Sequence, residues 1–359
     1  MMYSLDEIGL IPSIISHIKH RGDVNPYVFT DCEDYKLPIF VSPMTCIINA
    51  NNILTFDRSK VEPILPVVSA PLDLRCQLPN GSDWEGWTAV TMQEFGEMFN
   101  KCTAPEDKKY KILIDTANGH MEELFQRVKD AKQEYGDNLV VMIGNLANPQ
   151  TYTQCCKAKV DYVRVGIGGG SGCTTSVQTG IHTGMPYILN GITKIKCTRY
   201  LVPNENKIAT EATFNQWLKH NNYTETKIIA DGGVTTVSRA IKCLALGADY
   251  VMMGRCFAQC EEACGELRPP YPDMLVKERR YYGQSSEKGQ MDRFGKVKSN
   301  PEGTDYWIPV TTNLNDFTTH FEAALRSAMS YCNAKTLNDF IGKVEYEIMS
   351  PMEFNAFNK

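Results

Sequence analysis

The sequence predicts an α/β fold, a single (β/α)8 barrel of the TIM type spanning residues 1–359. From about residue 110 onward, short apolar segments alternate with amphipathic ones, the pattern of a parallel sheet covered by helices on both faces. We count seven such strands and one further candidate, and eight strands suit a closed barrel better than an open sheet. No Gly-x-Gly-x-x-Gly opens a helix after the first strand. This absence argues against the alternative fold, an open dinucleotide-binding sheet.

The expected strands are apolar and rich in β-branched residues, as in PIFVS and KIIAD, which suits strands buried on both faces. They cover residues 37–42, 64–70, 111–115, 139–144, 160–165, 227–231 and 249–254, and the eighth candidate is 186–189. The expected helices carry apolar residues at helical spacing, such as Leu124, Phe125 and Val128. They cover residues 88–100, 121–134, 149–158, 236–246 and 323–332.

Three segments do not fit the alternation of strands and helices. Residues 1–36 read as an irregular arm, and residues 190–226 read as an insertion that ends in a helix. Residues 266–310 are polar and rich in Gly and Lys, with no clear period. So long a segment inside a compact enzyme predicts a mobile lid.

The overall composition excludes some classes of partner. Apolar residues make up 43% of the chain and charged residues 22%, which is ordinary for a globular protein. A net charge of −5 gives no electrostatic reason to expect nucleic acid or an anionic membrane as a partner. No run of 18 apolar residues occurs, and residues 1–20 lack a signal-peptide layout, so we expect a cytoplasmic protein.

The thirteen cysteines, an odd number, argue for reduced thiols rather than a disulfide framework. Cys256, Cys260 and Cys264 have the spacing of one stripe on a helix. A metal or iron–sulfur site would usually include a tighter CxxC pair. We therefore interpret these three residues as small core residues.

The stretch 160–175, VDYVRVGIGGGSGCTT, carries the strongest chemical signal in the chain. It begins as a buried strand and then breaks into a run of glycines, which lets the backbone approach a ligand closely. A hydroxyl and a thiol follow at once, at the carboxyl end of a strand, where barrel enzymes place their catalytic groups.

Two more glycine clusters end predicted strands, namely Asp231-Gly232-Gly233 and Gly254-Arg255. In a barrel these are the last two strands, whose loops commonly hold a phosphate with backbone N–H groups. Asp231 beside them could accept hydrogen bonds from ribose hydroxyls. Either cluster alone is equally well explained as a tight turn, but together they favour a nucleoside monophosphate ligand.

Several of these segments resemble the inosine monophosphate dehydrogenase and guanosine monophosphate reductase family. The segments are VGIGGGSGCTT, IIADGG, GADYVMMGR, PIFVSPM, IDTANGH and MIGN, in the family's order, with an opening similar to SLDEIGLIPS and RGDV. The resemblance covers nearly the whole chain. It implies a (β/α)8 barrel, usually a homotetramer, that binds a purine nucleoside monophosphate and a nicotinamide cofactor.

The resemblance assigns roles to individual positions. Cys173 matches the nucleophile that attacks purine C2, and Thr175 matches a threonine that assists proton transfer. The positions matching substrate-binding residues are Ser42, Met44, Ser171, Asp231, Gly232, Gly233, Gly254, Arg255, Tyr281, Gly283, Gln284 and Ser285. Those on the cofactor side are Asp115, Asn118, Arg164 and Gly166. Gly168, Gly170 and Cys173 match positions whose carbonyls hold K⁺ in many of the dehydrogenases.

The lid decides between the two reactions. Residues 281–287, YYGQSSE, resemble the reductase pattern YGxSSE, which predicts Glu287 as the acid that protonates departing ammonia. Asn118 also favours the reductase, whereas Asp292-Arg293-Phe294 is similar to the DRY of the dehydrogenase lid but is misplaced. Residues 71–110 are too few for the regulatory modules, which contain CBS repeats, that many dehydrogenases insert there.

The predicted activity is the NADPH-dependent conversion of GMP to IMP and ammonia through a covalent bond from Cys173 to purine C2. NADH in place of NADPH stays open. The alternatives are an NAD-dependent IMP dehydrogenase and a catalytically silent paralogue that binds purine nucleotide. The chain also departs from the family: Thr45 replaces the usual aspartate after Met44, and Arg255 occupies a position usually held by Gly or Ser.

Overall fold

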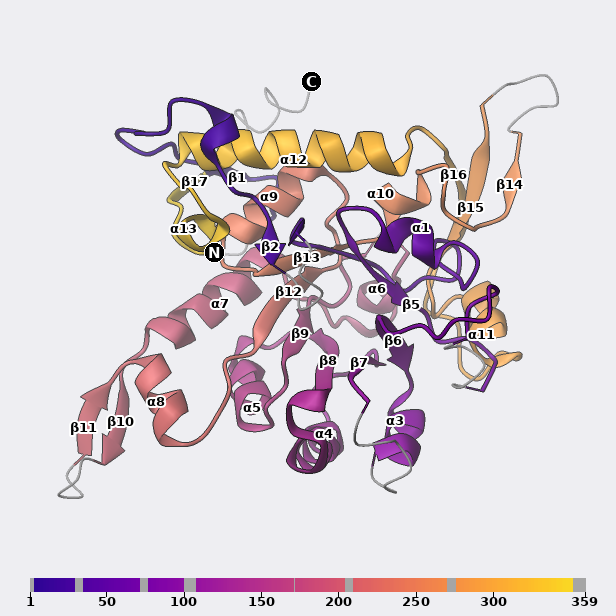
Figure 1. Ribbon diagram of the computed structural model, residues 1–359, viewed down its shortest axis with the longest axis horizontal. Helices are drawn as coiled ribbons and strands as arrows, with labels where there is room; N and C mark the ends of the chain where they lie inside the picture. The colour runs from indigo at the N-terminus through magenta and orange to yellow at the C-terminus, as the bar shows by residue number, and fades with distance from the viewer. Residues whose placement is uncertain are drawn as a thin grey trace.

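The computed structural model describes residues 3–29, 35–71, 77–99, 108–170, 172–203, 209–269 and 276–350. Its centre is a closed barrel of parallel strands in the order β12-β13-β4-β5-β6-β7-β8-β9 (Figure 1). These strands are β4 (Ile39–Val41), β5 (Glu62–Leu65), β6 (Trp87–Val90), β7 (Tyr110–Asp115), β8 (Leu139–Leu146), β9 (Tyr162–Val165), β12 (Lys227–Asp231) and β13 (Tyr250–Met253). The predicted α/β barrel is confirmed.

Both faces of the barrel strands are buried. In β7, Leu113 packs inside the barrel with Phe40 and Met252. Its neighbours Ile112 and Ile114 belong instead to the outer core, which the helices cover. Because successive side chains of a strand point to opposite faces, burial on both faces produces the continuous apolar runs seen in the sequence.

Helices surround the barrel, as Figure 1 shows for α3, α4, α5 and α7. They are α1 (Ile53–Asp57), α3 (Met92–Phe99), α4 (Glu122–Tyr135), α5 (Tyr152–Lys157), α7 (Met185–Cys197), α9 (Val237–Ala245), α10 (Arg255–Ala258), α12 (Leu314–Tyr331) and α13 (Leu337–Phe340). The helix α12 begins well before its predicted start because the Asn313 side chain caps it, accepting the Asp316 N–H at 2.8 Å. None of the helices in the described residues is long and apolar enough to cross a bilayer.

Two strand predictions were wrong. The third strand of the barrel is β6, which the sequence analysis merged into a helix over 88–100 because its four residues run directly into the helical pattern of α3. Residues 186–189, the predicted eighth strand, lie in α7. Pro186 sits in the first turn of that helix, where its missing N–H breaks no hydrogen bond.

The predicted insertion over 190–226 begins later than expected, because residues 190–197 complete the crossover helix α7. The segment beyond it forms a hairpin of β10 (Tyr200–Pro203) and β11 (Ala209–Ala212), followed by α8 (Phe214–His220). Figure 1 shows this hairpin extending away from the barrel. The Trp217 ring stacks on Tyr200 with centroids 4.7 Å apart, which ties the hairpin to α8.

The lid segment has more regular structure than its sequence suggested. Within 266–310, β14 (Leu267–Arg268), β15 (Glu278–Tyr282) and β16 (Asp305–Pro309) form an antiparallel sheet, and α11 (Glu287–Phe294) lies between the last two strands. These strands are short and rich in charged and aromatic residues, as in ERRYY of β15, so no long apolar run or regular period marks them in the sequence. The mobility of this lid stays a prediction.

The amino-terminal arm is also partly regular. The strand β1 (Ile8–Leu10) pairs antiparallel with β17 (Tyr346–Ile348), and β2 (Val28–Phe29) pairs with β3 (Tyr35–Lys36). Short 3-10 turns complete the described structure at Arg21–Asp23, Gly136–Asn138 and Pro149–Thr151. The arm therefore lies against the last helices of the barrel rather than forming an irregular extension.

Candidate active site

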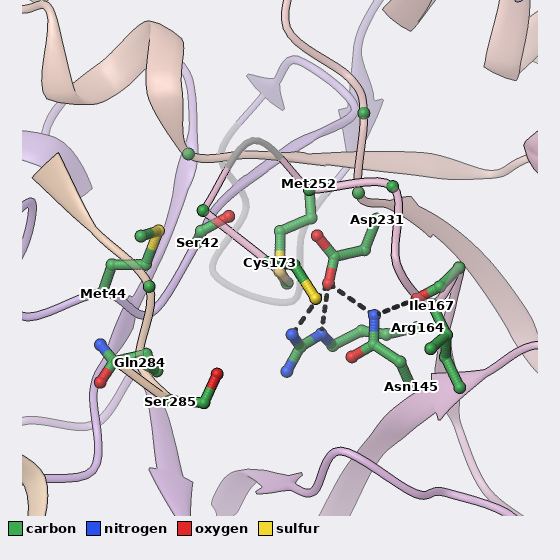
Figure 2. A pocket seen from close by; sticks show the side chains of 18 of the residues that line it. Ser42, Met44, Asn145, Arg164, Ile167, Cys173, Asp231, Met252, Gln284 and Ser285 are labelled. Atoms are coloured by element: carbon green, nitrogen blue, oxygen red, sulfur yellow. Dashed lines mark hydrogen bonds and ion pairs between the residues drawn. The ribbon is translucent and has the colours of Figure 1, made fainter. Parts of the chain in front are cut away.

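A cavity of about 250 Å³ opens at the carboxyl ends of the barrel strands (Figure 2). Ser42 follows β4 directly, Asp115 ends β7 and Asp231 ends β12, and all three line it. Gln284 and Ser285 of the lid segment close one side. This is the face on which barrel enzymes place their catalytic groups.

Most of the sequence-predicted site residues come together in this cavity. Those that line it are Ser42, Met44, Asp115, Arg164, Gly166, Gly168, Gly170, Cys173, Thr175, Asp231, Gly232, Gly233, Gly254, Arg255, Tyr281, Gly283, Gln284 and Ser285. Ser171 lies outside the described residues. Asn118 and Glu287 do not line the cavity.

Glu287 and Asn118 have exposed side chains. Glu287 is the first residue of α11, which the Ser286 hydroxyl caps by accepting the Gly289 N–H at 3.1 Å. The Asn118 side-chain oxygen accepts the His120 N–H at 3.1 Å and so stabilises its own turn. The role of Asn118 stays a prediction. The acid role of Glu287 is likewise untested, and the hydrogen bond from Thr175 to Glu302 makes Glu302 the better candidate for it.

The segment after β9 that carries Cys173, residues 166–175, is called the catalytic loop. Glycine is required where this loop passes the end of β12. Gly166 has a φ of +122°, and a Cβ atom there would lie 2.1 Å from the Asp231 carbonyl oxygen. Any side chain at 166 would therefore push the loop away from β12. The segment that leads to Cys173 therefore starts in close contact with β12.

Cys173 and Thr175 begin a hydrogen-bonded chain that ends on a carboxylate. The Cys173 thiol donates to Thr175 Oγ1 at 3.3 Å, and that hydroxyl donates to Glu302 Oε2 at 3.1 Å. Donors and acceptors alternate along this chain, so a proton that leaves the thiol has a continuous path to the carboxylate.

Backbone hydrogen bonds hold Glu302 in this position. The Thr174 N–H donates to the Glu302 carbonyl at 2.9 Å, and the Thr304 N–H donates to the Gly172 carbonyl at 3.0 Å. Cys173 and Gly303 form an antiparallel bridge between these two bonds. The catalytic loop and residues 302–304 therefore act as one paired unit.

A cluster of positive and negative side chains lines another part of the cavity wall, and Figure 2 draws its central contacts. Arg164 donates to Asp115 at 2.8 Å and to Asp231 Oδ2 at 2.8 Å, and Asn145 Nδ2 also donates to Asp231 Oδ2, at 2.9 Å. Four barrel strands, β7, β8, β9 and β12, thus meet in one network at their carboxyl ends. Each buried charge in it has a partner, which buried ions require.

The lid helix reaches into the same cluster. Arg293 of α11 pairs with Asp115 Oδ2 at 3.1 Å and donates to the Asp115 carbonyl at 3.0 Å. Burial of Asp115 opposes its ionisation, but the guanidinium groups of Arg293 and Arg164 outweigh burial and hold the pKa of this carboxyl below its ordinary value. The contact docks the lid on the end of β7.

The site residues that the sequence analysis missed include Glu302, Arg293 and Asn145. Glu302 lies 127 residues from Thr175, and no local pattern connects the two. Arg293 was noted in the sequence but judged misplaced, although the structure places it on the cavity wall. Asn145 ends the MIGN segment, and an amide near the carboxyl end of a barrel strand is the signal that could have identified it.

The K⁺ site expected at the carbonyl groups of Gly168, Gly170 and Cys173 stays a prediction. The Gly168 carbonyl accepts the Ser176 hydroxyl at 3.3 Å, and the Gly170 carbonyl accepts the Cys173 N–H at 3.0 Å. Two of the three carbonyl groups expected to hold K⁺ are thus already hydrogen-bonded within the chain. The reaction steps proposed for this site do not use a cation.

A nicotinamide cofactor is expected on the side of Asp115, where Thr116 and Ala117 also line the cavity. These residues and Arg164 would hold its polar end with hydrogen bonds and charge. The arginines beside Asp115 are already paired with carboxylates.

The remaining cysteines form no metal site in the part of the chain that the structure describes, since no group of three or more potential ligands occurs there. The helix α10 ends at Ala258, so Cys260 and Cys264 lie beyond it rather than on one helical stripe with Cys256. Cys256 and Cys260 are buried, in agreement with their interpretation as core residues.

A family model described as IMP dehydrogenase / GMP reductase domain matches residues 88–355. The inosine-5'-monophosphate dehydrogenase of Chlorobaculum tepidum is 34% identical over 243 residues, which cover 64% of this chain and 43% of that protein. The chain therefore spans less than half the length of that dehydrogenase. The GMP reductase of Helicobacter pylori is 29% identical, and that of Oceanobacillus iheyensis 26%, each over 99% of this chain and 98% of the reductase.

Proposed function

The chain belongs to the IMP dehydrogenase and GMP reductase family, and we propose that it acts as a GMP reductase. The relatives that it matches are oxidoreductases. The reaction would convert GMP to IMP and ammonia with NADPH as reductant. The observation that carries the proposal is the hydrogen-bonded chain from Cys173 through Thr175 to Glu302, beside the cavity at the carboxyl ends of the strands. Full-length alignment with GMP reductases adds support.

In the first step, the Cys173 sulfur forms a bond to purine C2 while the bond from C2 to the amino nitrogen breaks. The thiol proton must leave the sulfur, and the departing amine must gain one. Glu302 receives that proton through Thr175 and returns it to the amine, so the step releases neutral ammonia.

In the second step, the carbon–sulfur bond breaks and C2 gains hydrogen. A bound reduced nicotinamide cofactor supplies the hydride that this reduction needs. The sulfur leaves as a thiolate, a good leaving group, and takes up a proton again to restore Cys173. The lid residues Gln284 and Ser285, which border the cavity, exclude water that would otherwise hydrolyse the covalent intermediate.

Asp231 is suited to bind the ribose. Its Oδ2 atom accepts hydrogen bonds from Arg164 and Asn145, whereas its Oδ1 atom accepts none among the described residues. A carboxylate oxygen held rigidly in this way can accept hydrogen bonds from ribose hydroxyls.

The charges on the cavity wall support a place for the 5′-phosphate of the nucleotide. The cavity wall contains three arginines and two aspartates, and Arg164 and Arg293 are both paired with aspartates. Within the described part of the chain, Arg255 is the lining cation without a carboxylate partner. It stands beside Gly254 and the Gly232–Gly233 turn, where a dianionic 5′-phosphate would balance its charge.

An IMP dehydrogenase is the second candidate, because Arg293 of the lid lies on the cavity wall, where it could act on water. Both reactions share the covalent bond to Cys173 and differ in whether water or ammonia is handled. A silent nucleotide-binding paralogue would need no thiol at this place. A homotetramer is expected by resemblance.

Two parallel absorbance assays of purified protein separate these functions. One contains GMP with NADPH or NADH; the other contains IMP with NAD⁺ and K⁺. Loss of reduced cofactor with release of ammonia in the first, abolished by Cys173→Ala, is the expected result. A gain only in the second would establish the dehydrogenase, and nucleotide binding with no turnover in either would indicate the silent paralogue.

A further inference from the structure

An ion pair joins the amino-terminal arm to α9. This helix follows the loop 232–235, where the phosphate is expected. Asp6 precedes β1, and Arg239 lies in the first turn of α9. Arg239 Nε donates to Asp6 Oδ1 at 2.7 Å, and Arg239 Nη2 donates to Asp6 Oδ2. Both carboxylate oxygens are thus bound by one guanidinium, a two-pronged geometry that fixes the direction of the arginine side chain.

The third nitrogen of the same guanidinium, Nη1, contacts the loop after β12. Arg239 Nη1 donates to the Gly233 carbonyl at 3.1 Å and to Thr235 Oγ1 at 2.9 Å. Gly233 and Thr235 line the cavity, whereas Arg239 does not. The guanidinium therefore holds the loop from the side that faces away from the ligand.

This contact helps to fix the Gly233 carbonyl, which also accepts the Thr235 N–H at 3.0 Å, and with it the direction of the adjoining N–H groups. In a trans peptide the carbonyl oxygen and the following N–H lie on opposite sides, so a Gly233 carbonyl held outward turns the Val234 N–H toward the cavity. Among the described residues, the N–H groups of Gly232, Gly233 and Val234 donate no backbone hydrogen bond. Thr235 accepts from Arg239, which leaves its hydroxyl proton available to a ligand.

We propose that Asp6 and Arg239 are positioning residues that orient the loop 232–235 for a 5′-phosphate, so that the amino-terminal arm forms part of the nucleotide site. The inference rests on the proposed function, which places the phosphate at this loop. Neither residue touches the nucleotide. Their loss is expected to weaken the binding of a nucleoside monophosphate without weakening that of the nucleoside.

The test is calorimetric titration of the full chain with GMP and, separately, with guanosine. Asp6→Asn and Arg239→Gln should each raise the Kd for GMP about tenfold, the effect of losing one hydrogen bond to a charged group. The Kd for guanosine should stay within about threefold, which also reports that the site is folded. Asp6→Glu, which keeps the carboxylate, should retain most of the affinity for GMP.

Glu123→Gln and Arg127→Gln provide matched controls, because these residues form a similar pair on α4, away from the cavity. They should leave both Kd values unchanged. If Asp6→Asn and Arg239→Gln keep the wild-type preference for GMP over guanosine, the positioning role is overturned and the proposed function stands. If the wild-type protein itself binds GMP no better than guanosine, the phosphate placement and this inference both fail.

Discussion

Thr45 donates a hydrogen bond to Asp292 at 3.2 Å, which joins the loop after β4 to the lid helix α11. Tyr282 donates to the same carboxylate oxygen at 2.7 Å. From the family resemblance an aspartate is expected at the position of Thr45, and here the lid supplies the carboxylate instead. The departure at 45 is thus matched by a complementary residue in space.

This pairing predicts that Thr45→Asp destabilises the docked lid, because it would place two carboxylates within hydrogen-bonding distance. We expect the free energy of unfolding to fall by about 1–3 kcal/mol, measured by urea denaturation. Adding Asp292→Asn to Thr45→Asp should restore most of the loss. Thr55→Asp on the exposed surface of α1 is the control, and an equal loss in that variant would contradict the explanation.

Asp115 should stabilise the fold in a pH-dependent way. Its pKa is lower in the folded protein than its ordinary value, because Arg293 and Arg164 outweigh the effect of burial. Its stabilisation is therefore present above the unfolded pKa of about 3.9 and is lost as the pH falls through the lower folded value. Asp115→Asn should cost about 2–3 kcal/mol near pH 7.

The stability difference between wild-type protein and Asp115→Asn should shrink below about pH 4. Urea denaturation at several pH values between 3 and 7 measures it directly. A difference that stays constant or grows in acid would show that the carboxylate is not stabilised by these two arginines.

Alkylation should distinguish Cys173 from the structural thiols. Burial raises the pKa of Cys46 and of Cys243 to about 12, so both stay protonated and unreactive. Cys173 is partly exposed, and Cys197 is exposed and remote from the cavity. Iodoacetamide followed by peptide mapping should label Cys173 and Cys197, and GMP should protect Cys173 alone; protection of both or of neither would contradict the placement of the nucleotide.

Local patterns in the sequence were enough to place much of the site. The glycines and the Cys173 loop form one continuous motif, and the loop geometry follows from the same residues. The strand β6 was missed because four residues carry too little periodicity to separate them from the helix that follows. Pro186 was misread because proline at the start of a helix and proline beside a strand look alike without tertiary contacts.

The contacts between distant segments were beyond the sequence. Asp115, Arg164 and Asp231 were each expected in the site, but their ion pairs depend on how three strands meet in the barrel. Glu302 was missed for the same reason, since its hydrogen bond to Thr175 depends on pairing between the lid segment and the catalytic loop. Sequence analysis favoured Glu287 because it lies in a recognisable motif.

The most direct test of the proposed chemistry compares two glutamates of the lid segment, Glu302 and Glu287. The measurement is the rate of ammonia release from GMP in the presence of NADPH, for Glu302→Gln and Glu287→Gln in parallel. Because Glu302 is hydrogen-bonded to Thr175, we predict a loss of about 10²–10⁴-fold in Glu302→Gln, the usual contribution of general acid–base catalysis. Glu287→Gln should retain the wild-type rate within about threefold, whereas a large loss confined to Glu287→Gln would contradict the assignment of the proton path to Thr175 and Glu302.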